Sequence, residues 1–169
     1  MKKALFIIIV AALSLPAFSQ KSAVDNLLDR YNGQEGFTSI YISSKMFSLL
    51  SRIDSEDEEF QNLVNRIKSI RILSIDSSRN VMHLNFATDL VPRLSRSGYE
   101  ELMTVKEPGD EIRFMVREEG GRIAELVMIT GGAGSSVVCI TGNLDLKTIA
   151  SLSEGLDVGG LEGLEKVEK

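Results

Sequence analysis

Few residues of this sequence have the types and spacing that catalysis or metal binding requires. His83 is the only histidine and Cys139 the only cysteine, which excludes multi-histidine and mixed His/Cys metal centres within the sequence. A serine nucleophile would have to use His83 as its base, but no G-x-S-x-G segment presents such a serine. We therefore interpret His83, between Met82 and Leu84, as a packed or half-exposed side chain.

Two short segments imitate ligand-binding loops. Residues 131–136 (GGAGSS) are as rich in glycine as a phosphate-binding loop, but the next lysine is Lys147 and the intervening residues favour a strand. A hairpin turn explains this segment better. The acidic run 54–59 lacks the glycine and the distant glutamate of an EF-hand loop. Its Ser55 and Glu58 fit a capping box at the start of a helix.

Paired carboxylates are the remaining route to catalysis. The 24 acidic residues leave a hydrolase with an unrecognised carboxylate site as an open alternative, because sequence spacing does not place two acids in space. The sequence has no tryptophan and only 6% aromatic residues, which disfavours a carbohydrate cleft. No motif indicates a cofactor, and we expect none.

The first nineteen residues have the order of a secretory signal peptide. Lys2 and Lys3 precede an apolar run from Ala4 to Leu13, and Ala17 and Ser19 supply small residues before a cleavage point. The run is too short to span a bilayer, which takes about 20 residues as a helix. Gln20 follows, where a lipid-acceptor cysteine would stand in a lipoprotein. The sequence therefore predicts export to the periplasm or medium, in soluble form and without a transmembrane anchor.

Cleavage would leave 150 residues, which suits one domain. We expect that domain over residues 20–154 and a loosely ordered tail over 155–169. Without Lys2 and Lys3 the chain has 17 basic and 24 acidic residues, a net charge of −7. Such a charge disfavours binding to nucleic acid or anionic lipid. Cys139, in a strand-like run, has no intramolecular partner and is predicted to be buried.

Hydrophobic periodicity predicts five helices and six strands. Four helices are expected around 22–31, 46–53, 55–67 and 81–97, and a further helix is expected after Asp145. The helix at 81–97 contains Pro92. The strands are expected at Phe37–Ser43, Ile70–Asp76, Tyr99–Val105, Asp110–Arg117, Arg122–Thr130 and Ser135–Thr141, the last closed by Gly142 and Asn143. Short glycine-containing turns join the last four strands as an antiparallel meander. The fold class is therefore α+β, with a mainly antiparallel sheet and helices packed on one face.

Three segments carry a resemblance to a known family. They are the strand-to-helix entry at 37–46, the start of the meander at 99–103, and the join between last strand and last helix at 142–147. With the signal and the length, the chain resembles domain-of-unknown-function family 4252, exported proteins typical of Bacteroidetes. The resemblance covers nearly all of the mature chain and implies no known activity, cofactor or catalytic residue. Many members are lipoproteins, from which Gln20 sets this chain apart.

The predicted strand from Arg122 to Thr130 is apolar on both faces, whereas a sheet covered on one side usually shows polar residues on the other. The two sets are Ile123, Val127 and Ile129 on one face, and Ala124, Leu126 and Met128 on the other. We predict self-association or a protein partner at Ala124, Leu126 and Met128, with burial inside the domain as the alternative.

The leading functional hypothesis is a non-enzymatic binding or accessory protein of the cell envelope. The alternatives are the hydrolase and a small-ligand carrier. A deep pocket with two close acids would favour the hydrolase, and an enclosed apolar cavity would favour the carrier. A shallow surface would favour binding.

Overall fold

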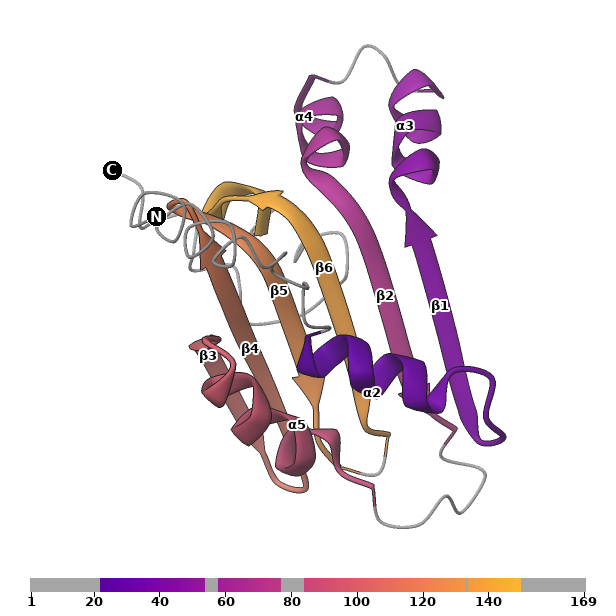
Figure 1. The fold of residues 1–169 in the computed structure, drawn as a ribbon, viewed down its shortest axis with the longest axis vertical. Coiled ribbons are helices and arrows are strands. Elements are labelled where there is room, and N and C mark those ends of the chain that lie inside the picture. Colours follow the sequence, from indigo (N-terminus) through magenta and orange to yellow (C-terminus); the bar gives the residue numbers. More distant parts are fainter. Residues whose placement is uncertain (1–21, 54–57, 77–83, 133, 150–169) are drawn as a thin grey trace, which may run out of the picture.

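The computed structural model describes residues 22–53, 58–76, 84–132 and 134–149 (Figure 1). The signal peptide predicted at 1–19 and the tail predicted at 155–169 lie outside the described residues, as do Ser55 of the predicted capping box and His83. Every strand and helix named below belongs to the described segments.

A six-stranded antiparallel sheet forms the centre of the fold. Its strands are β1 (Phe37–Ser43), β2 (Ile67–Ile75), β3 (Glu100–Glu107), β4 (Asp110–Glu119), β5 (Arg122–Thr130) and β6 (Ser136–Leu144). They lie in the order β1-β2-β6-β5-β4-β3 (Figure 1), so the predicted meander is confirmed and the two early strands extend it beyond β6. Gly120 and Gly121 join β4 to β5 with φ angles of 60° and 74°, the conformation of the type I′ turn that favours hairpins.

Four helices flank the sheet in the described part of the chain, which confirms the α+β fold. They are α2 (Ala23–Tyr31), α3 (Ser44–Ile53), α4 (Glu58–Arg66) and α5 (Phe86–Arg96). A capping box that the periodicity did not reveal starts α2: Ser22 Oγ accepts from Asp25 N at 3.0 Å, and Ser22 N donates to the Asp25 carboxylate at 3.3 Å. Pro92 lies inside α5, as predicted.

The first face of the sheet is covered by α2 and α5, which cross in front of the strands in Figure 1. Apolar residues of both helices, such as Leu28 and Leu90, are buried in one cluster with strand residues such as Met115 and Val127. The amphipathic spacing of α2 explains this arrangement, because Val24, Leu27 and Leu28 share one side of the helix and are all buried.

The second face also receives helix side chains, which differs from the expectation of helices on one face only. Phe47 of α3 and Val64 of α4 belong to a second cluster with strand residues such as Leu126 and Ile140. The reason is topological: β1 leads directly into α3, and α4 leads directly into β2. The helix pair stands at the end of these two strands (Figure 1), and its apolar side chains reach the face that α2 and α5 leave uncovered.

Two details of the strands correct the sequence-based assignment. Ile123 was expected beside Val127, but a register shift between Ile123 and Glu125 in the pairing of β5 with β6 changes the alternation. Ile123 therefore lies in the second cluster, with Leu126. The last strand also runs on past Gly142 and Asn143 to Leu144, after which Asp145 caps a first helical turn at 146–149.

Candidate binding surface

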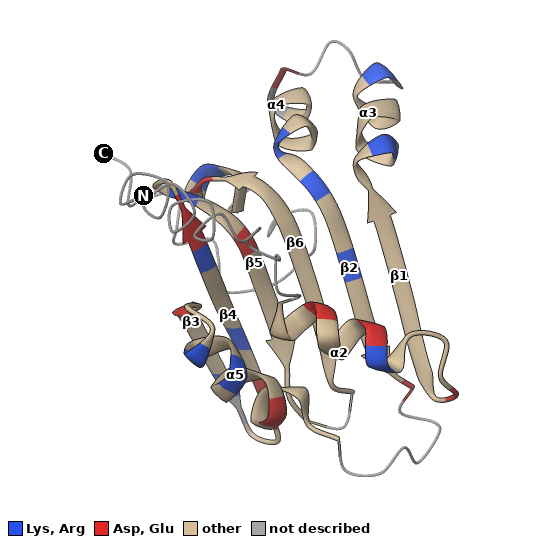
Figure 2. Cartoon of the chain, viewed as in Figure 1, with Lys and Arg blue, Asp and Glu red and all other residues tan. Residues whose placement is uncertain are grey.

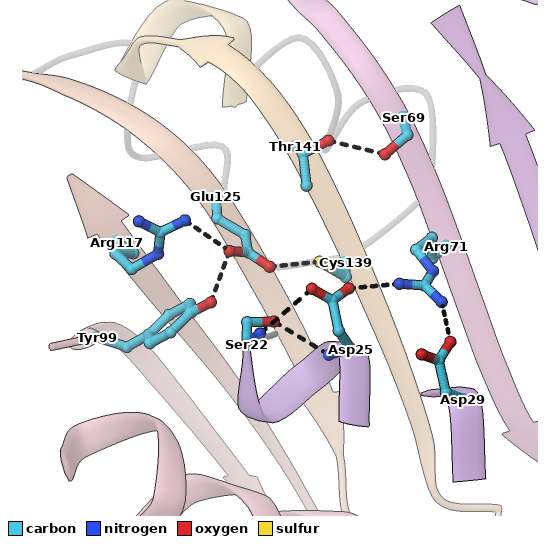
Figure 3. Close-up of polar contacts among 10 residues, drawn as sticks. All are labelled: Ser22, Asp25, Asp29, Ser69, Arg71, Tyr99, Arg117, Glu125, Cys139 and Thr141. Atoms are coloured by element: carbon cyan, nitrogen blue, oxygen red, sulfur yellow. Dashed lines mark hydrogen bonds and ion pairs between the residues drawn. The ribbon is translucent and has the colours of Figure 1, made fainter. Parts of the chain in front are cut away.

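The first face carries a buried carboxylate, Glu125, which is 4% exposed. Tyr99 Oη donates to Glu125 Oε2 at 2.6 Å, Arg117 Nη2 donates to the same oxygen at 3.1 Å, and Cys139 Sγ donates to Oε1 at 3.0 Å (Figure 3). The partners come from β4, β6 and the residue before β3. Both oxygens of Glu125 are thus bonded by groups of the protein itself, which makes this network a structural link between strands.

The network keeps the phenol of Tyr99 and the thiol of Cys139 protonated. Burial, together with the neighbouring carboxylate of Glu125, raises the pKa of the Tyr99 phenol and of the Cys139 thiol well above their usual ranges. Burial acts to lower the pKa of Arg117, but hydrogen bonds to Glu119, Tyr99 and Glu125 raise it overall. Cys139 therefore stays a thiol and is a poor nucleophile. The prediction that Cys139 is buried is confirmed, since it is 1% exposed.

Sequence reasoning missed Glu125 as a buried residue. The available signal was its position: it is the one acid in the nine residues of β5, between Ala124 and Leu126. An acid at an inward strand position needs partners. Arg117 lies opposite Glu125 in the hairpin of β4 and β5, but Tyr99 and Cys139 come from elsewhere in the chain, so their part in the network becomes visible only in the folded chain.

A pocket of about 500 Å³ lies beside α2 on the first face. Its lining is mixed: polar residues such as Asp25, Ser69 and Thr141 stand beside the apolar Leu28 and Ile72, and the pocket is open to solvent. Asp25 is ion-paired with Arg71, whose other terminal nitrogen is 2.8 Å from Asp29, and Ser69 and Thr141 share a hydrogen bond of 2.8 Å (Figure 3). This lining is unlike the enclosed apolar cavity that a carrier of apolar ligands needs.

Three arginines of the sheet each lie between two acids. Arg71 pairs with Asp25 and Asp29, Arg113 with Glu101 and Glu111, and Arg117 with Glu119 and Glu125. Hydrogen bonds from Thr104 and Arg113 hold the pKa of Glu101 below its usual range. A hydrolase needs the opposite for its general acid, a carboxyl group whose pKa is raised.

On the second face, an apolar row crosses every strand of the sheet. The register aligns one residue from each strand, and we call this set the apolar strip: Ile40, Ile72, Val138, Met128, Phe114 and Met103. Phe114 is buried and Ile40 is 46% exposed, while the other four are half-buried. The strip is therefore incompletely covered across most of its length.

The rows on either side of the strip differ in chemistry. One neighbouring row contains Leu126 and Ile140, which are buried in the cluster that includes Phe47 of α3. The opposite row consists of hydroxyl residues on four strands, namely Thr38, Ser74, Ser136 and Thr130, and continues with Ile112 and Val105 on β4 and β3. Over β1, β2, β6 and β5 the strip thus lies between a row packed under helices and a polar row.

The residues predicted for association lie at different depths in this face. Met128 belongs to the apolar strip and is half-buried. Leu126 is 5% exposed in the neighbouring row, and Ala124 is half-buried at the irregularity of β5. Leu126 and Met128 share one face, as expected from strand alternation. Association through these residues stays a prediction.

Exposed apolar side chains gather at one end of the sheet. Of the five large apolar residues that are exposed in the described segments, four come from β1 and α3: Ile40, Tyr41, Met46 and Leu49. Tyr41 is the most exposed, at 68%. The edge of the sheet formed by β1 therefore adds apolar surface next to the outer end of the strip.

Comparison with known proteins assigns the chain to a family. A profile described as "Domain of unknown function (DUF4252)" matches residues 31–152, from the end of α2 to beyond β6. The chain belongs to this family. The resemblance found in the sequence is thereby confirmed, and the DUF4252 match covers all six strands. No curated protein and no solved structure matches the chain.

Two further observations bear on the site. In the described segments of this DUF4252 chain, no three His, Cys, Asp or Glu residues are grouped so that they could hold a metal ion. No helix among the described residues has the length and apolar character needed to cross a membrane.

Proposed function

We propose that the chain is an exported, non-enzymatic binding protein that docks a protein partner on the apolar strip of its second face. The observation that carries this proposal is the half-covered row of apolar residues that runs over all six strands. Antiparallel sheets usually turn polar residues to solvent, and incompletely covered apolar surface marks interaction sites. Met128, predicted for association from the sequence, lies near the middle of this row.

The distribution of carboxylates supports binding over hydrolysis. The buried Glu125 uses both oxygens for hydrogen bonds within the protein, and the acids near Arg71 and Arg113 are ion-paired. The pocket beside α2 includes one acid, Asp25, and that acid is paired with Arg71. A second pocket, of about 340 Å³, contains Glu58 and Asp145, but Asp145 is ion-paired with Arg66 and its pKa is lowered, whereas a general acid needs a raised pKa. The pairing of these acids favours a surface that recognises a partner over a cleft that holds a reactive acid.

Export rests on the order of residues 1–19, with Lys2 and Lys3, the apolar run and the small residues before Gln20. The intact mass of the protein recovered outside the cytoplasm should begin at Gln20, with or without cyclisation of that residue. A pool that retains residues 1–19, or that is found only in the cytoplasm, contradicts this part of the proposal.

Docking on the strip is tested by site-specific photo-crosslinking in the native cell. A photoreactive phenylalanine at Ile72, in the strip, should give an adduct of discrete mass, whereas one at the exposed Arg96 of α5 should not. Val138→Thr keeps the shape of the side chain and adds a hydroxyl, so it should lower the yield of the adduct at position 72. Equal adducts at 72 and 96, or none at either, would contradict docking there.

A further inference from the structure

The two outer strands of the sheet have different protection against pairing. β1 is seven residues long, contains no charged residue and no proline, and pairs with β2 without a register shift. β3 carries Glu100, Glu101 and Lys106, and its pairing with β4 shifts register between Glu101 and Met103. Figure 2 shows β1 without charged residues along its length.

Charges and bulges are the usual means by which an outer strand avoids pairing with another chain. β3 has both and β1 has neither. β1 also places two large apolar side chains at its centre, Ile40 and Tyr41, which are 46% and 68% exposed. An outer strand of this kind offers unpaired backbone groups and apolar contacts to an extended partner.

The geometry points to a second copy of this chain as that partner, with β1 pairing antiparallel to β1 of the other copy about a twofold axis at Ile40. This register is self-complementary. It places Ile40 opposite Ile40 and Ser39 opposite Tyr41, so apolar contact forms at the centre and the bulky tyrosine meets a small residue.

The charges that flank β1 complement each other in the same register. Glu35 precedes the strand and Lys45 follows it, and both are exposed. An antiparallel pair centred on Ile40 brings Glu35 of one copy alongside Lys45 of the other, and the twofold axis makes this contact twice. A parallel arrangement would instead set each charge beside its own kind.

The paired strands would also join the two apolar strips. Residues directly opposite each other in an antiparallel pair lie on the same face, so Ile40 connects the strip of one copy to that of the other. The pairing goes beyond the proposed function, because it uses the edge of the sheet and does not depend on a partner occupying the strip.

Sedimentation velocity of the purified protein over a range of concentrations tests the pairing. We expect a dimer that dissociates on dilution. Ile40→Lys and Ile40→Glu each place like charges opposite each other, so each variant alone should be a monomer of half the mass. An equimolar mixture of the two variants should restore the dimer, because lysine then faces glutamate.

Thr104→Lys is the matched control, since it places the same charge in the middle of β3, and it should remain dimeric. A wild type that is monomeric at every concentration would overturn the pairing. Folded Ile40 variants that still dimerise alone, or whose mixture stays monomeric, would also overturn it.

Disulfide trapping gives a second measurement that needs no charge in β1. Ser39→Cys and Tyr41→Cys are made separately in a Cys139→Ala background, and both positions are exposed. Mild oxidation of the mixture should give much more cross-linked dimer than either variant alone, because position 39 faces position 41. Equal yields from the mixture and from the single variants would refute the register.

The two proposals fail separately. A wild type that is monomeric at every concentration but still gives the photo-crosslink at Ile72 would refute the pairing of β1 and leave docking on the strip in place. A stable dimer without the photo-crosslink at Ile72 would support the pairing of β1 and refute docking on the strip.

Discussion

The two faces of the sheet meet at the same strands but differ in how completely they are covered. Val137 and Val138 are neighbours on β6, yet Val137 is 0% exposed under α2 and α5, and Val138 on the other face is half-buried. The first face also holds the one buried glutamate of the described residues, with every oxygen bonded. Under α2 and α5, full cover thus accompanies a closed polar network, and on the second face incomplete cover accompanies an apolar row that can accept a partner.

The largest expected effect comes from opening the network on the first face. Glu125→Ala should destabilise the protein by about 3 kcal/mol, because it leaves the buried Tyr99 hydroxyl and the Arg117 charge without their acceptor. Urea unfolding measures this cost. The control is Glu101→Ala, which removes a carboxylate that is also bonded to an arginine but is exposed, and it should cost less than about 1 kcal/mol. Similar costs for the two variants would show that the buried network contributes no more to stability than an exposed ion pair.

Two adjacent valines compare the faces directly. Val137→Ala should cost about 2 kcal/mol, because it removes two fully buried methyl groups, and Val138→Ala should cost about half as much in the free protein. Urea unfolding of both variants provides the measurement. Equal costs would mean that the second face is covered as fully as the first.

The reactivity of thiols gives a third comparison. Cys139→Ala should keep the fold at a cost of about 1 kcal/mol, because the side chain lost is small. Native Cys139 should react with a thiol reagent far more slowly than a cysteine placed by Val138→Cys in the Cys139→Ala background. If Cys139 reacted as fast as a cysteine in a free peptide, its burial under α2 and α5 would be wrong.

The smallest expected effect concerns Asp145, at the end of β6. Burial acts to raise the pKa of Asp145, but hydrogen bonds from Thr148 and the charge of Arg66 lower it overall. A lowered pKa in the folded state stabilises the protein above the unfolded pKa of about 4, and this contribution is lost as the pH falls through the folded pKa.

Asp145→Asn keeps a capping oxygen and removes the charge, so it should cost about 0.5 kcal/mol at pH 7. The difference from wild type should shrink in urea titrations as the pH falls below about 4. A difference that is constant from pH 7 to pH 2 would assign the effect to packing and not to the ion pair with Arg66.

The sequence determines the elements more clearly than the surfaces they build. β1 and β5 begin and end at the residues that the apolar pattern and the turns predict, because those signals are local. The docking of β2 against β6 is a pairing of distant segments, and it alone brings Ile72 into line with Val138. Local periodicity holds no information on that register, so the strip could be predicted only at Met128.

Local periodicity also does not predict which face a helix packs against or where a strand becomes irregular. Nothing in the spacing of α3 shows which face Phe47 will reach, since that depends on where the chain turns after β1. In its pairing with β4, β5 has one extra residue near Ala124, and Ile123 lies on the opposite face from the one that simple alternation predicts.

The burial of Cys139 has a consequence for the proposed export of the protein to an oxidising compartment. A lone accessible thiol there would exchange with glutathione or with disulfides of other chains, because the attacking species is the thiolate. Cys139 is 1% exposed, and its raised pKa keeps the thiolate scarce. With no second cysteine in the sequence, the chain has no intramolecular disulfide to gain or lose when its redox surroundings change.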